Sequence, residues 1–215
     1  ASLTKVMTAL VALKNGNRED VLTASANVRI TESGATLSGL KEGDKMTLDQ
    51  ALRILLLQSA NDVAIMIAEQ YGGTVEHFCE MMNEEAGAIG ATNCRFANPH
   101  GLTDENHYVT AYDMYLIFNE ACKYELFKEI IGMNAYTTVY YDAGGGEITF
   151  DKPSTNWYFT GEAVAPAGIT VLGGKTGTTA AAGKCLVLLS SDTSGKSYIS
   201  VILKSEERGV MYTEM

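Results

Sequence analysis

The hydrophobic pattern changes twice along the chain of 215 residues, and this limits the possible folds more than any other feature. Residues 47–132 show helical spacing, and Thr47 and Gln50 form a predicted capping box before the apolar run ALRILLL. The segments on either side contain short runs rich in Val, Ile, Thr and Tyr, which are typical of strands. A helical block between strand-forming ends predicts an α/β protein with a sheet part and a helical part, separated by a cleft.

The two ends of the chain supply the predicted strands and one further helix. Residues 3–15 are predicted to form a short helix that stops at Gly16. Residues 135–151 predict a hairpin around three consecutive glycines. Three more β segments are predicted at 168–176, 184–191 and 197–204. We expect one catalytic domain over 1–215, with a helical half at about 47–132 and a sheet half from 1–46 and 133–215.

Composition excludes several classes of function. The net charge of −10 argues against a nucleic-acid partner, although a small peptide can still bind where the local charge suits it. No apolar run is long enough to span a bilayer, so membrane association would need segments outside these residues. The cysteines and histidines lack metal-ligand spacing, so we expect free thiols, no metal site and no cofactor. These residues are Cys79, Cys94, Cys122, Cys185, His77, His100 and His107.

Three short motifs carry candidate chemistry, and two of them occur more than once. Each is weak alone, because a pattern such as Ser-x-x-Lys should occur about once by chance in a chain of this length. They include Ser2–Lys5 and Ser38–Lys41 for Ser-x-x-Lys, Ser25–Asn27 and Ser59–Asn61 for Ser-x-Asn, and Lys175-Thr176-Gly177 for Lys-Thr-Gly.

Structural context separates the copies. Ser2 and Lys5 lie at the start of a predicted helix, where positions i and i+3 share a face. Ser38 lies in a glycine-flanked loop, where the same spacing fixes no geometry. Ser59 and Asn61 lie between two helical runs, where a sharp connection can direct both side chains into a cleft. The ordered set Ser-x-x-Lys, Ser-x-Asn, Lys-Thr-Gly is more specific than any of its members.

This ordered set resembles the signature of penicillin-binding proteins and class A β-lactamases. The segments SLTKVMTAL, LLLQSANDVAIMIAE, FANPHGLTDENHYVTAYDM and GGKTGTTAAAG are similar to the D-alanyl-D-alanine carboxypeptidase family, and the similarity runs from Ser2 to about Lys204. The resemblance implies a β-lactamase/transpeptidase-like fold, with an antiparallel sheet, flanking helices and an inserted helical half. In that family, strands precede the Ser-x-x-Lys motif and chains continue further at the C terminus. We therefore expect a fragment whose sheet has an uncovered edge.

The resemblance also implies a role for each motif residue. Ser2 would be the nucleophile, Lys5 its base and Ser59 a proton relay to the leaving amine. Asn61 would bind the substrate's peptide group, and Lys175, Thr176, Gly177 and Thr178 would bind its C-terminal end. The backbone N–H groups of Ser2 and Thr178 would form the oxyanion hole. Many relatives have His where this chain has Thr178.

The implied substrate is a peptidoglycan pentapeptide that ends in D-Ala-D-Ala, and β-lactams would be covalent inhibitors. The implied location is outside the cytoplasmic membrane. Two alternatives stay open, a serine β-lactamase and a penicillin-binding sensor that acylates without turnover. Class A β-lactamases need a deacylating Glu, which the loop CRFANPHGLTDEN does not present in their form. Within that loop, His100 is expected to be mainly structural.

Overall fold

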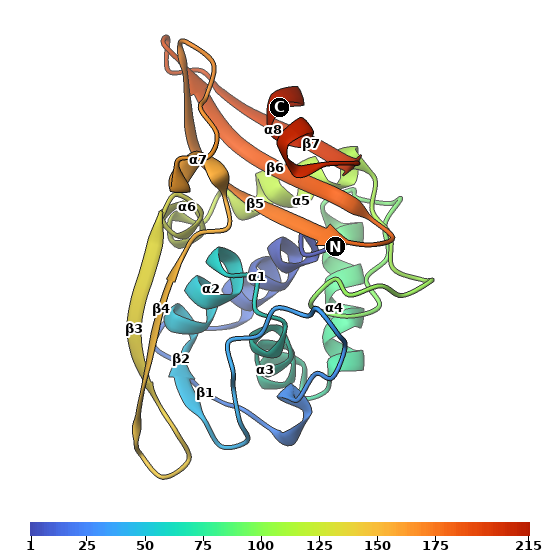
Figure 1. Ribbon diagram of the computed structural model, residues 1–215. Coiled ribbons are helices and arrows are strands. Elements are labelled where there is room, and N and C mark those ends of the chain that lie inside the picture. Colours follow the sequence, from blue (N-terminus) through green and yellow to red (C-terminus); the bar gives the residue numbers. More distant parts are fainter.

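The computed structural model describes residues 1–215 and contains two antiparallel sheets with helices between and around them (Figure 1). The helices are α1 (Thr4–Asn15), α2 (Leu48–Leu57), α3 (Asn61–Gly72), α4 (Val75–Ala88), α5 (Ala111–Ala121), α6 (Glu125–Ile131), α7 (Trp157–Thr160) and α8 (Arg208–Glu214), with a 3₁₀ turn at Ala26–Val28. The strands are β1 (Val21–Thr23), β2 (Lys45–Thr47), β3 (Ala135–Tyr141), β4 (Glu147–Pro153), β5 (Ile169–Thr179), β6 (Gly183–Asp192) and β7 (Ser197–Ser205). The predicted mixed fold, with its helical block and strand-forming ends, is confirmed.

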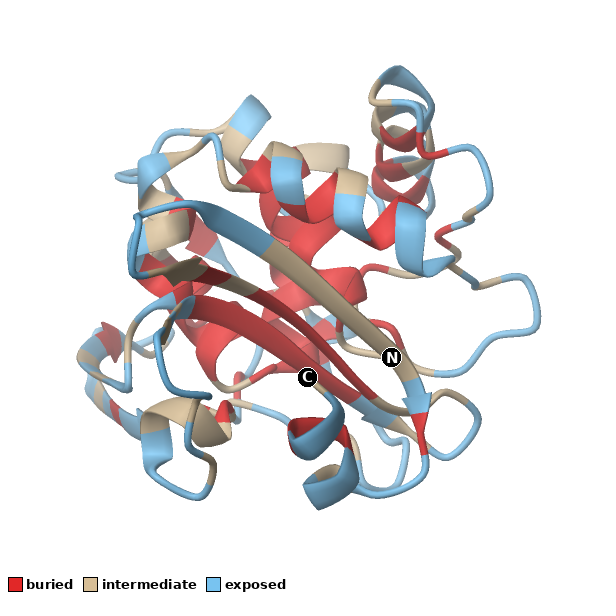
Figure 2. Ribbon diagram, turned by 90° about the horizontal axis from the view of Figure 1, so that it is seen from above, coloured by how far each residue is buried: buried red, intermediate tan, exposed pale blue.

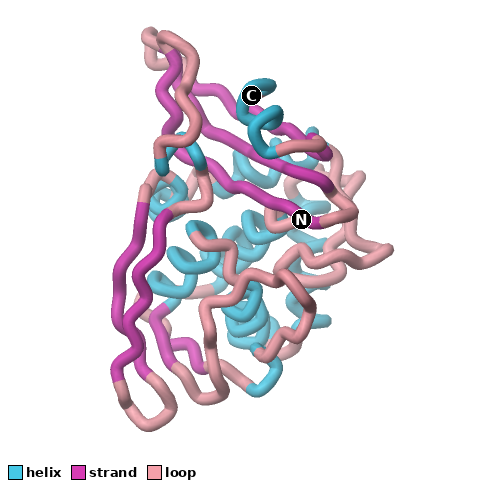
Figure 3. Tube along the Cα trace, viewed as in Figure 1, coloured by secondary structure: helices cyan, strands magenta, loops and turns pink.

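Helix α1 is the centre of the molecule. Every residue from Thr4 to Ala12 is buried, because α2, α3, α4 and α5 all contact this helix. A helix that is buried all round can hold a side chain in a fixed position at its first turn. Gly16 follows the helix as its C-terminal cap, as the sequence predicts. Figure 3 shows the helices grouped between the two sets of strands.

The predicted hairpin forms, but it does not join the three C-terminal strands. β3 pairs along its length with β4, from Ala135 opposite Pro153 to Tyr141 opposite Glu147. At the other edge β3 meets β2, so β1–β4 form a four-stranded sheet beside the helical half. Sequence patterns predict strands one at a time, whereas the choice of partner depends on the packing of α2 against β3.

The second sheet has the order β5-β6-β7, and helices pack against both of its faces. On β6, Cys185 and Val187 face the main core, whereas Leu186 and Leu188 contact Met211 and Tyr212 of α8. This alternation follows from the two-residue period of a strand. β7 pairs with β6 alone, so its other edge is uncovered, and its residues are more exposed than those of β6 (Figure 2).

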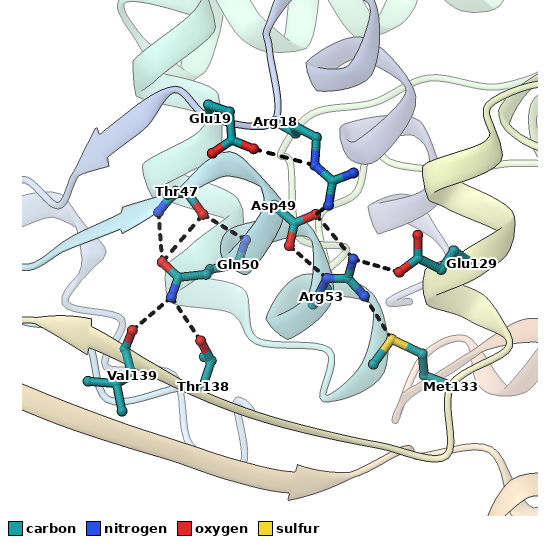
Figure 4. A network of polar contacts seen from close by, with 10 residues as sticks. All are labelled: Arg18, Glu19, Thr47, Asp49, Gln50, Arg53, Glu129, Met133, Thr138 and Val139. Carbon is teal, nitrogen blue, oxygen red and sulfur yellow. Dashed lines mark hydrogen bonds and ion pairs between the residues drawn. The ribbon is translucent and has the colours of Figure 1, made fainter.

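A polar network fixes the start of α2 (Figure 4). Thr47 and Gln50 form the predicted capping box, and the Gln50 amide also donates to the carbonyl oxygen of Val139 on β3 at 2.8 Å. One turn later the buried Arg53 donates to Asp49 and Glu129, each at 2.8 Å. These contacts tie the N-terminal part of α2 to β3 and α6. They therefore fix the position of its C-terminal end, which approaches the cleft.

No helix of the structure is both long enough and apolar enough to cross a membrane. The four cysteines are all free thiols. Burial raises the pKa of the Cys79, Cys94 and Cys122 thiols to about 11, which favours their protonated form at neutral pH.

Candidate active site

Ser2 and Lys5 lie together at the start of α1, as the helical spacing predicts. The Lys5 ammonium group is completely buried and lies 2.9 Å from the Ser2 hydroxyl. It also lies 2.6 Å from the side-chain oxygen of Asn61 and 2.6 Å from the backbone carbonyl of His100. No carboxylate pairs with this lysine.

The surroundings of Lys5 favour its neutral form. Burial, followed by the positive charge of Lys175, lowers the pKa of Lys5 well below its usual range, and Asp62 partly opposes this shift. A neutral amine has two N–H donors and one lone pair. It can donate to Asn61 and to the His100 carbonyl, both of which only accept in this geometry, and accept the proton of the Ser2 hydroxyl. The three contacts therefore match a lysine that is ready to act as a base.

Ser59 and Asn61 occupy the sharp connection between α2 and α3. Ser59 has φ +69°, in the left-handed region that costs a residue with a side chain about 1–3 kcal/mol and is often found at functional sites. Asn61 begins α3, and its backbone N–H donates to the carbonyl of Thr36. Its side-chain oxygen accepts from Lys5, so the amide is oriented with its NH₂ group available to donate to a ligand.

Lys175 lies behind the site and does not line it. Its ammonium group is 1 % exposed and donates to the Ser59 hydroxyl at 2.8 Å and to the Thr176 carbonyl at 2.7 Å. Burial, and then the charge of Arg208, lowers the pKa of Lys175 to about 7. The lysine is therefore placed to contact Ser59, whereas Thr176 faces the cavity.

The lack of a side chain at Gly177 lets β5 pass against the start of α1. A Cβ atom at this position would lie 2.9 Å from the backbone nitrogen of Ser2 and 3.0 Å from that of Leu3. The close approach places the N–H of Ser2 beside the end of β5, where Thr178 is exposed. The absence of a side chain at Gly177 therefore makes room for the backbone of Ser2 and Leu3.

These elements enclose a cavity of about 260 Å³. Its lining includes the predicted residues Ser2, Ser59, Thr176, Gly177 and Thr178. It also includes residues that the sequence analysis missed, namely Thr36, Gln58, Thr155, Cys185, Arg208 and Met211. A larger hollow of about 380 Å³ beside Ala1 is mainly apolar and includes neither Ser2 nor Ser59, so the smaller cavity is the candidate site.

No sequence pattern around Arg208 predicts that this residue lies at the site. It follows the last strand as the first residue of a short helix, with no motif around it. Its place in the cavity comes from the docking of α8 on β6 and β7. Thr155 was missed for the same reason; its hydroxyl lies 2.6 Å from that of Thr176.

The loop that contains His100 is attached firmly to α1. The Thr8 hydroxyl donates to the carbonyl of Pro99 at 2.6 Å, and the His100 carbonyl accepts from Lys5. Burial, followed by the charge of Lys5, lowers the pKa of His100 to about 3. Its ring is therefore neutral, and its Nδ1 accepts from the backbone N–H of Leu102. The structure gives His100 a positioning role through its backbone.

The duplicate motifs lie elsewhere. The hydroxyl and backbone N–H of Ser38 both donate to the buried carboxylate of Asp62, at 2.9 and 3.0 Å. Ser25 caps the 3₁₀ turn, and the side chains of Ser25 and Asn27 both donate to Glu69. Neither Ser38 nor Ser25 has a lysine partner, so Ser38 does not repeat the arrangement at Ser2 and Ser25 does not repeat that at Ser59.

The fold and the site define a class of protein, the DD-peptidases of the penicillin-binding type. The crystal structure of the Streptomyces K15 DD-transpeptidase is similar with a TM-score of 0.89 and 28% sequence identity, over 99% of this chain and 83% of that one. The sequence model of the D-alanyl-D-alanine carboxypeptidase family matches residues 1–207. The chain therefore belongs to this family, as its motifs predict.

Curated members of the family show the extent of the match. The D-alanyl-D-alanine carboxypeptidase DacC of Escherichia coli is 32% identical over 100% of this chain and 52% of its own length. DacF of Bacillus subtilis is 36% identical over 61% of this chain and 35% of its own length. The chain thus spans about a third to a half of these relatives.

Proposed function

We propose that the chain is the catalytic unit of a serine-type D-Ala-D-Ala carboxypeptidase. Its substrate would be a peptidoglycan stem peptide, and its place of action would be outside the cytoplasmic membrane, where that substrate lies. The observation that carries the proposal is the contact of a buried, low-pKa Lys5 with the Ser2 hydroxyl. The main core cluster of 43 buried residues includes members of both halves, which supports one catalytic domain.

The acylation step follows from the geometry. Ser2 Oγ attacks the carbonyl carbon of the last peptide bond, and Lys5 accepts the hydroxyl proton. The N–H groups of Ser2 and Thr178 stabilise the oxyanion, by analogy with the superfamily. As the C–N bond breaks, Ser59 gives its proton to the leaving amine and is reprotonated by the proton that Lys5 took from Ser2. Lys175, which contacts Ser59 at 2.8 Å, stabilises the negative charge that develops on Ser59 during this relay. D-Alanine leaves, and the peptide stays as an ester on Ser2.

Hydrolysis of this ester completes the cycle. Water attacks the ester carbonyl and gives a proton to Lys5. Lys5 passes this proton to Ser2 Oγ as the ester bond breaks, which restores the Ser2 hydroxyl and releases the shortened peptide with a free carboxyl end. Thr176, Thr178 and Arg208 line the cavity and are the candidate partners for the C-terminal carboxylate of the substrate. Asn61 would donate its free NH₂ to the substrate's peptide carbonyl.

The lining of the cavity disfavours a β-lactamase. Its residues include no Asp or Glu that could activate water against a penicilloyl ester. We therefore expect β-lactams to acylate Ser2 and to leave slowly, so that they act as inhibitors. The sensor alternative shares this acylation and differs only in the absence of peptide turnover.

Two measurements test the proposal. Intact mass spectrometry after penicillin treatment should show one adduct that Ser2→Ala abolishes and that the control Ser38→Ala retains. Release of D-alanine from a peptide that ends in D-Ala-D-Ala should then be measured. Turnover supports the carboxypeptidase. A stable adduct without peptide turnover supports a sensor. Rapid hydrolysis of penicillin supports a β-lactamase. An adduct on Ser38 would overturn the assignment of the active site.

A further inference from the structure

Arg208 is a cation at the cavity without an anionic partner. It lines the cavity with Ser2, Ser59 and Thr176, and no Asp or Glu pairs with it. In a chain of net charge −10, an arginine at a cavity with no carboxylate neighbour is available for an anionic ligand. Its guanidinium has five N–H donors, of which one donates to the carbonyl of Thr155 at 2.5 Å, and the group also lies beside the Tyr212 hydroxyl.

An aromatic pair holds this guanidinium. The central carbon of the group lies 4.9 Å from the centre of the Trp157 ring, within cation–π range. Trp157 in turn stacks on Tyr212, with ring centres 5.1 Å apart and an angle of 12° between planes. The backbone N–H of Trp157 also donates to the Tyr212 hydroxyl at 2.9 Å.

The arrangement joins two short helices that are far apart in the sequence. Arg208 and Tyr212 are four residues apart on α8 and share one face of it, so both reach Trp157 at the start of α7. Tyr212 is buried against β6 with Met211. Thr155 is anchored as well, because its backbone N–H donates to the carbonyl of Leu57 at 3.1 Å.

We propose that Trp157 and Tyr212 are positioning residues that hold Arg208 in place to bind the C-terminal carboxylate of the peptide substrate. This inference rests on the proposed function. An arginine side chain is long and flexible, whereas a bound carboxylate needs the guanidinium group at one distance and one angle. The indole ring and the Thr155 carbonyl fix the guanidinium before the ligand arrives, which reduces the entropy lost on binding.

The test compares two peptides that differ only at the C terminus, a D-Ala-D-Ala acid and its amide. For the acid, Trp157→Ala should lower kcat/KM about threefold to thirtyfold, mainly through KM, in line with the strength of a cation–π contact. Arg208→Ala should lower it about tenfold to a hundredfold, as expected for a lost charged hydrogen bond. Turnover of the amide should change little in either variant, since the amide lacks the charge.

Milder variants keep the test informative if Trp157→Ala does not fold. Trp157→Phe keeps a ring and should retain most of the activity on the acid. Tyr212→Phe keeps the stack but loses the bond to the Trp157 N–H, and should cost about twofold to tenfold. Tyr198→Ala is the matched control, because it removes a cation–π contact between Tyr198 on β7 and Lys196 (5.3 Å), and neither residue lines the cavity.

The outcomes separate the inference from the proposed function. Loss on the acid alone, and no further loss when Trp157→Ala is added to Arg208→Ala, supports the positioning role. Equal loss on acid and amide, or full additivity of the two variants, overturns it and leaves Trp157 with a general effect on stability. A wild-type protein that cleaves neither peptide would overturn the proposed function and, with it, this inference.

Discussion

The Lys5 ammonium group lies 2.9 Å from the Ser2 hydroxyl, within one turn at the start of a helix that is buried on every side. Neither side chain can move far, because Lys5 is also held by Asn61 and by the His100 carbonyl. In the proposed mechanism, acylation at Ser2 therefore depends on the protonation state of one lysine, which burial and the charge of Lys175 shift toward the neutral form.

Loss of Lys5 should be more damaging than loss of Lys175. Lys5→Ala removes the base that contacts Ser2, and general-base catalysis is worth typically about 10²–10⁴-fold in rate. Lys175→Ala removes a charge and the contact to Ser59, and should have a smaller effect on acylation. Stopped-flow rates with a chromogenic β-lactam at one pH make the comparison, and near wild-type acylation by Lys5→Ala would exclude its role as the base.

Stability should rise with pH because of Lys175. Its pKa is about 7 in the folded protein and about 10.5 in the unfolded chain. Between these values the unfolded state binds more protons, so the free energy of unfolding increases with pH, by up to about 1.4 kcal/mol per pH unit. The penalty for the buried charge is complete below pH 7 and disappears above pH 10.5.

Urea unfolding of wild type and Lys175→Met from pH 7 to pH 10 measures this effect. The wild type should gain several kcal/mol relative to the variant across this range. Lys152→Met changes an exposed lysine on β4 and should give a curve parallel to the wild type. A constant difference between wild type and Lys175→Met would show that Lys175 is not desolvated as described.

Gly177→Ala should impair both folding and acylation. The added Cβ atom would meet the backbone nitrogens of Ser2 and Leu3 at 2.9 and 3.0 Å, so either β5 or the start of α1 must move. We expect a loss of about 1–3 kcal/mol in stability, typical of overpacking, and a slower acylation of Ser2.

A glycine in open space provides the control for this change. A Cβ atom at Gly87, within α4, would meet nothing within 4 Å. Gly87→Ala should therefore stabilise the protein by about 0.5–1 kcal/mol and leave acylation unchanged. Thermal unfolding and β-lactam acylation of both variants check the pair, and equal behaviour of the two would contradict the close approach at Gly177.

The sequence by itself determined the features that depend on near neighbours along the chain. The capping box at Thr47, the stop at Gly16 and the hairpin of β3 and β4 all follow from local rules. The same reasoning selected Ser2–Lys5 over Ser38–Lys41, because three-residue spacing brings side chains together only in a helix. Family membership followed from the ordered motifs for the same reason, since each motif is short and continuous.

Tertiary structure alone decided which distant groups meet. It separated the strands into two sheets, placed Lys175 behind Ser59, and brought Arg208 to the cavity. It also joined Trp157 to Tyr212, 55 residues apart in the chain. No periodicity encodes such pairs, because they depend on how α8 and β5 pack against the rest of the molecule. The lowered pKa values of Lys5 and Lys175 have the same origin, since burial is a property of the folded chain.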